Sequence, residues 1–87
     1  MTAPPEQVAA QLTRAQARIV MSMGPEFVDY AAAGIIQRRT RIRLNQLGVT
    51  EPQQVGPVTL YCNIRLSALG VAVRDILRAA HVEEARK

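Results

Sequence analysis

Cysteine, histidine, tryptophan and lysine are nearly missing from these 87 residues. Cys62 is the single cysteine, so no intrachain disulfide and no cysteine-based metal cluster can form. His81 is the single histidine and Lys87 the single lysine. No run approaches the ~18 apolar residues of a membrane span, and the polar segment after Met1 is not a signal-peptide pattern. We therefore expect a soluble, cytoplasmic protein with no membrane partner, no metal and no cofactor.

Aromatic residues are also scarce, because only Phe27, Tyr30 and Tyr61 carry aromatic rings. Hydrophobic residues nevertheless make up 48% of the chain, so a core can form from Val, Ile, Leu, Met and Ala. A chain of this length holds one domain. Cores of this size rarely contribute more than roughly 3–5 kcal/mol, so a second copy would help by covering more apolar surface.

Acidic residues are outnumbered by basic ones, 7 against 11, which gives a net charge of +4 and a pI near 10.2. All the basic residues except Lys87 are arginines. A GC-rich genome explains that preference for arginine as well as selection for phosphate binding does. The positive charge itself favours an anionic partner, which is nucleic acid or, less often, an acidic protein or membrane surface.

The first half of the chain has helical periodicity. Apolar spacing predicts a first helix from residue 5 to residue 23, ended by Gly24-Pro25, although Thr13 can instead begin a second helical piece. A second helix is predicted over 26–33, with Pro25 at its start. A turn at Ala33-Gly34-Ile35 separates it from a third helix over 36–47. The apolar stripe of that third helix consists of Ile36, Thr40, Leu44 and Leu47.

The second half begins with alternation of period two. Residues 58–66 alternate apolar and polar side chains, which favours a half-buried strand, although a helix through Tyr61, Ile64, Ala68 and Val71 fits almost as well. Residues 49–51 would supply the antiparallel partner and 52–57 the hairpin loop.

The last helix is predicted to begin after Ser67, a good N-cap. Its apolar face would leave Arg74 and Arg78 pointing outward, and Gly70 would be small so that another backbone can approach. We expect a disordered start over 1–5, a single domain over 6–82 and a frayed tail over 83–87.

Three segments resemble winged helix-turn-helix domains of MarR- and PadR-like regulators. They are LTRAQ at 12–16, similar to the first helix of such domains, RTRIRLNQLGV at 39–49, similar to the end of a recognition helix, and YCNIRLSALG at 61–70, similar to the return strand of the wing. The resemblance implies a mainly α fold with a small β-hairpin, in the order α-α-α-β-β-α. It also implies sequence-specific binding of double-stranded DNA by a small prokaryotic or phage transcriptional regulator, paired as a homodimer through its first and last helices. A four-helix domain like that of LuxR regulators is the rival fold.

Four arginines within six residues make the third helix the candidate DNA-binding element. Arg38 and Arg41 would contact guanine, Gln37 adenine, and Ile42 a thymine methyl group. Other candidate contacts are Arg39 and Arg43 to phosphates, Asn45 on the outward face, and Arg65 to the DNA backbone. A solvated helix face is the alternative interpretation. The hairpin loop 52–57 holds no cation, which counts against contacts there.

Catalytic patterns are missing, so we expect no enzymatic activity. His81 lies among Arg78, Glu83 and Glu84 without a nucleophile, and Cys62 is typical of a small buried apolar residue. Two alternatives to DNA binding stay open. One is a protein-interaction module whose basic helix binds an acidic partner, and the other is a phage structural or adaptor protein.

Overall fold

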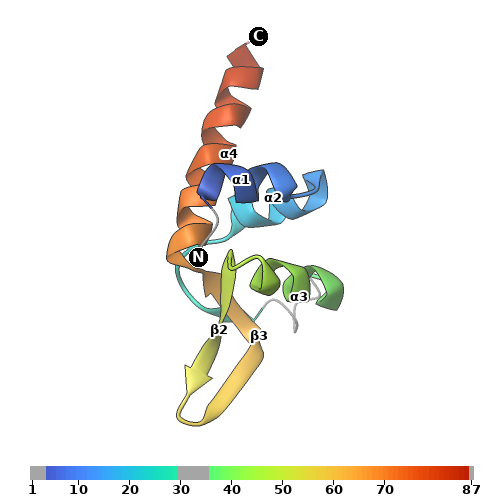
Figure 1. Cartoon of the computed structure of the whole chain (residues 1–87). Helices are drawn as coiled ribbons and strands as arrows, with labels where there is room; N and C mark the ends of the chain where they lie inside the picture. Colours follow the sequence, from blue (N-terminus) through green and yellow to red (C-terminus); the bar gives the residue numbers. More distant parts are fainter. Residues whose placement is uncertain (1–3, 30–35, 87) are drawn as a thin grey trace.

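A computed structural model describes residues 4–29 and 36–86 of the chain, with side chains up to residue 82. Over these residues the fold contains four α-helices and a three-stranded antiparallel sheet (Figure 1). The elements in chain order are α1 (Pro5–Gln11), α2 (Arg14–Ser22), β1 (Val28–Asp29), α3 (Arg38–Gln46), β2 (Thr50–Val55), β3 (Val58–Leu66) and α4 (Ala68–Arg86). The observed order is therefore α-α-β-α-β-β-α, with one strand more than a simple hairpin.

The predicted first helix is divided at Thr13, as the alternative interpretation allowed. The Thr13 hydroxyl accepts a hydrogen bond from the backbone N–H of Gln16 at 3.1 Å, and the Gln16 side-chain oxygen accepts one from the Thr13 N–H at 3.0 Å. This reciprocal capping box satisfies two N–H groups that have no partner within the helix. It starts α2 in a new direction after the short α1.

The prediction of a helix over 26–33 is wrong where the structure describes it. Val28 and Asp29 form the strand β1 and pair with Ile64 and Asn63 of β3. Pairing with this edge of β3 satisfies backbone groups that would otherwise lack partners, and this tertiary gain overrides the local helical pattern. The remainder of that helix and the turn predicted at Ala33-Gly34-Ile35 lie outside the described residues.

The third predicted helix is confirmed as α3, two residues shorter at its N-terminus and one at its C-terminus. Leu44 is fully buried, Ile36 is buried just before the helix, and Thr40 and Leu47 are half-buried, so the predicted stripe does face the core. Gly48 follows with a φ of +77°, the left-handed conformation that commonly ends a helix at glycine.

The strand predicted over 58–66 is confirmed as β3, and it lies between β1 and β2 in the sheet. The loop predicted over 52–57 is wrong for most of its length, because β2 continues to Val55. Only Gly56 and Pro57 form the turn, with Gly56 at a φ of +59°. Glycine at the first position suits a two-residue hairpin turn. Pro52 is tolerated because β2 is an edge strand, where a missing N–H matters least.

The last helix starts at the predicted cap and runs further than expected. The Ser67 hydroxyl accepts a hydrogen bond from the Gly70 N–H at 3.1 Å, and the Ser67 N–H donates to the Val49 carbonyl at 3.0 Å. Residues 83–86, predicted to be frayed, belong to α4. Figure 1 shows the end of α4 extending beyond α1 and α2, while the β2–β3 hairpin extends the opposite way.

The core joins these elements through small and medium-sized aliphatic side chains. Its buried members are Val8, Val20, Met23, Ile36, Leu44, Val49, Ile64, Leu66 and Val73. Arg74 and Arg78 were predicted to point outward, but both side chains reach back to the end of α2. Their guanidinium groups donate to the carbonyl oxygens of Met23 and Met21, each at 3.0 Å, and only 17% of the Arg74 side chain is exposed. None of the described helices combines the length and apolarity needed to cross a membrane.

Candidate nucleic-acid interface

The outward face of α3 carries most of the predicted site residues. Gln37, Arg38 and Arg39 are exposed at its start, and Arg43 is exposed near its end. Ile42 is 45% exposed, as expected for a residue opposite the core stripe. Arg41 is half-buried, because one of its terminal nitrogens donates to the Ile36 carbonyl at 3.3 Å. This bond leaves the other terminal nitrogen of the guanidinium fork for an external acceptor.

The electrostatics of α3 are unfavourable at its N-terminus. No acidic residue lies in its first turn, and Gln37 at the N-cap makes no side-chain capping hydrogen bond. Arg38, Arg39 and Arg41 instead place positive charge where the helix dipole is already positive. Among the described residues, neither ion pair in the structure involves these arginines. An anion bound here would therefore be stabilised by the guanidinium groups and by the N–H groups of the first turn.

Tyr61 of β3 lies beside this face, and sequence analysis did not predict it as a site residue. It lines a depression of about 280 Å³ together with Arg38, Arg41, Ile42 and Asn45. The tyrosine is 67% exposed, more than any other large hydrophobic residue described. The one sequence signal for the exposure of Tyr61 was its place among the polar residues of the alternating strand.

The β2–β3 hairpin has an irregular register at Tyr61. Pro52 of β2 pairs with Ile64, but the next residue, Gln53, pairs with Leu60. Residues 61–63 therefore have no paired residue on β2. Such irregularities bend a strand and re-aim its side chains. No sequence pattern in the alternating segment marked this shift.

The Arg65 side chain contacts two neighbouring side chains, Glu51 and Phe27. Its Nε lies 2.6 Å from a carboxylate oxygen of Glu51, its cross-strand partner, and its guanidinium carbon lies 4.4 Å from the ring centre of Phe27. About 42% of its side chain is exposed. The charge of Arg65 is therefore paired with a carboxylate on the neighbouring strand, unlike the charges of the arginines on α3 among the described residues. The geometry does not group it with the arginines of α3.

Asn45 and Arg43 also have structural contacts. The Asn45 side-chain oxygen accepts a short hydrogen bond from the Thr50 hydroxyl, which ties the end of α3 to the start of β2. Arg43 lies in the last turn of α3, where its charge complements the negative end of the helix dipole. Asn45 also lines the depression, where its amide adds two N–H donors.

The remaining reactive side chains are scattered. Cys62 is a half-buried free thiol, and His81 is exposed on α4. The described part of the chain contains no group of three or more His, Cys, Asp or Glu side chains that could hold a metal ion. The chain matches no protein-family model, no curated protein and no solved structure.

Proposed function

We propose that this chain is a winged helix-turn-helix module that binds double-stranded DNA in a sequence-specific manner, as a transcriptional regulator does. The observation that carries the proposal is the set of arginines at the N-terminal end of α3, which have no ion-pair partner among the residues that the structure describes. A helix with this charge distribution fits the major groove, where its first turns meet base edges and its flanks meet phosphates. Arg38 and Arg41 would contact guanine, while Arg39 and Arg43 would contact phosphates.

The β2–β3 hairpin would act as a wing beside α3, with a smaller share in binding. The segment from Pro52 to Ile64 carries no charged residue. Val55 and Val58 flank the turn and are 51% and 53% exposed. Without a cation, the hairpin tip cannot form an ion pair with phosphate, so the electrostatic part of the affinity would come from α3.

Binding should weaken steeply with salt, because phosphate contacts release counterions. With two phosphate contacts per protomer and two protomers, the log–log slope is about −3.6, or roughly 100-fold in affinity between 50 and 200 mM salt. Fluorescence anisotropy on a pool of genomic duplexes would measure this slope. The double variant R39Q/R43Q should flatten it while leaving the fold, checked by circular dichroism, unchanged. No binding to any duplex at low salt would overturn the proposed function.

An acidic protein is the second candidate partner, favoured by one observation. Ile42 and Tyr61 expose apolar surface within a basic face, a combination also found at protein interfaces. Binding to DNA and binding to an acidic protein differ in one readily measured respect. Only DNA binding yields a preferred base sequence when bound fragments are selected from a genomic pool.

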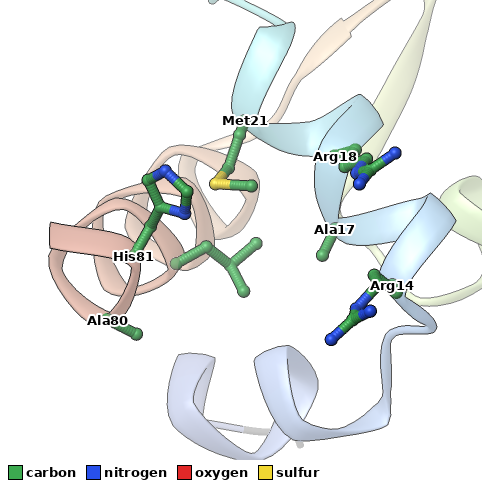
Figure 2. Close-up of a pocket in the computed structure, with 7 residues that line it drawn as sticks. Arg14, Ala17, Arg18, Met21, Ala80 and His81 are labelled. Atoms are coloured by element: carbon green, nitrogen blue, oxygen red, sulfur yellow. The ribbon is translucent and has the colours of Figure 1, made fainter. Parts of the chain in front are cut away.

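A second part of the proposal is a homodimer through α2 and α4. Between these helices lies a groove of about 420 Å³ (Figure 2). Met21, Leu77 and Ala80 give it an apolar lining, and Arg14, Arg18 and His81 add cationic or titratable groups. The chain carries an apolar counterpart of its own, because Val82 is 49% exposed on the projecting end of α4. A two-fold dimer would place each such end on the other copy's groove.

The oligomeric state tests the dimer independently of DNA. Ala80 is exposed at the groove, so A80R should fold normally while placing a bulky charge in the contact. We expect the wild type to sediment as a dimer at micromolar concentration and A80R as a monomer. Ala10 is exposed on α1 and does not line the groove, so A10R is the matched control and should remain dimeric. A wild type that is monomeric at every accessible concentration would exclude this interface.

A further inference from the structure

The depression beside α3 combines positively charged groups with exposed apolar surface. Arg38 and Arg41 supply guanidinium groups, while Ile42 and Tyr61 supply apolar surface from a helix and a strand. Ile42 is 45% exposed and Tyr61 is 67% exposed, so both side chains are open to a ligand without any rearrangement of the core. The depression is therefore a preformed surface, and its chemistry indicates which bases it fits.

Hydrogen-bond donors dominate the polar part of this surface. A guanidinium group donates and cannot accept. The oxygen of Asn45 accepts a hydrogen bond from the Thr50 hydroxyl, and the two N–H groups of its amide are further donors at this surface. Guanine presents two acceptors in the major groove and thymine presents one, whereas cytosine presents an amino donor and adenine presents an amino donor beside its one acceptor. A surface rich in donors therefore favours the keto bases, guanine and thymine.

The apolar part of the surface favours thymine as the base that Ile42 and Tyr61 contact. The C5 methyl of thymine is the apolar group that base pairs expose in the major groove, and aliphatic or aromatic side chains contact it. Water is released from Ile42, from the ring of Tyr61 and from the methyl group when the three meet. A phosphate group offers no such apolar partner, so backbone contacts alone do not use these two residues.

From this arrangement we propose that Ile42 and Tyr61 form a joint contact for a thymine methyl group, next to a guanine bound by Arg38 or Arg41. Tyr61 is then a specificity-determining residue. The hairpin would thus contribute to base recognition although its tip carries no cation. The inference rests on the proposed DNA binding, because it assigns base preference to the same site. It predicts a selected site in which a thymine neighbours a guanine.

The test compares thymine with uracil, which differs only by the C5 methyl group. A preferred duplex is first selected from a random pool, and each thymine in it is then replaced singly by deoxyuridine. Burial of one methyl-sized group corresponds to about a fourfold change in affinity. We expect the full-length wild type to lose about fourfold or more at one thymine position beside a guanine in each half-site, and to be indifferent to the methyl group elsewhere.

Protein variants link that methyl group to the two side chains. In the double variant I42A/Y61A, thymine and uracil duplexes should bind equally well at the sensitive position. Y61F should keep the discrimination, because it retains the ring and removes only the hydroxyl. Both positions are exposed, so circular dichroism should show unchanged folding.

The possible failures are distinguishable. If a duplex is selected but every thymine can be replaced without loss, or if I42A/Y61A still discriminates, this inference is wrong while DNA binding stands. If no duplex is retained at low salt, the proposed function is itself wrong and the inference falls with it.

Discussion

The double variant R38A/R41A is expected to lose at least about 1000-fold in affinity for its preferred duplex. A bidentate contact to guanine contributes about 1–3 kcal/mol, so the two contacts of a single protomer, at about 2 kcal/mol each, already correspond to three powers of ten. Both arginines line the same depression on α3, and neither has an ion-pair partner among the described residues. Anisotropy titrations at fixed salt against preferred and scrambled duplexes would measure the loss.

The matched control for this variant is R38K/R41K. Lysine keeps the positive charge but lacks the planar fork that grips guanine. The lysine variant should therefore bind scrambled duplexes about as well as the wild type, while its preference for the selected duplex falls. If R38A/R41A loses the same factor of affinity for the preferred and the scrambled duplex, and R38K/R41K restores binding to both, the two arginines contact phosphates only, and their assignment to base recognition is wrong.

The largest effect on stability is expected for G70A in the first turn of α4. A Cβ atom at this position would lie 2.0 Å from the carbonyl oxygen of Val49 and 3.1 Å from Leu66 Cδ2. The carbonyl belongs to backbone that also accepts the Ser67 N–H, so α4 cannot move away without breaking that bond. We expect a loss of about 3 kcal/mol or more in the free energy of unfolding. For a chain of this size that corresponds to a fall in Tm of about 12–24 °C.

The sign of this effect separates packing from helix propensity. Alanine is favoured over glycine inside a helix by ~1 kcal/mol, so propensity alone predicts stabilisation. Gly24 provides the control, because a Cβ there would meet nothing within 4 Å. Thermal unfolding followed by circular dichroism should show G24A within about 0.5 kcal/mol of the wild type. A G70A protein as stable as G24A would contradict the close approach of α4 to Val49.

Local sequence signals identified the features whose causes are themselves local. Thr13 is recognisable as an N-cap because the glutamine three residues later completes a capping box. The strand over 58–66 was recognisable from nine alternating residues. The exposure of Ile42 followed from helical spacing alone. In each case the information lies within a few residues along the chain.

The features that were missed depend on partners far away in the sequence. Val28 is in a strand because the distant edge of β3 is there to pair with it. Tyr61 reaches the face of α3 alongside a register shift in the hairpin that no alternating pattern reveals. Arg65 looked free until Glu51 and Phe27 were placed beside it. Pairing, register and cross-strand neighbours are properties of the assembled sheet.

The two hydrogen bonds from α4 to the end of α2 have a consequence for cooperativity. Arg74 and Arg78 reach the carbonyl groups of Met23 and Met21 across 51 and 57 residues of sequence. These carbonyls belong to the end of a nine-residue helix, too short to be stable by itself in water. The final turn of α2 therefore depends on a docked α4, and the two ends of the chain fold and unfold as one cooperative unit.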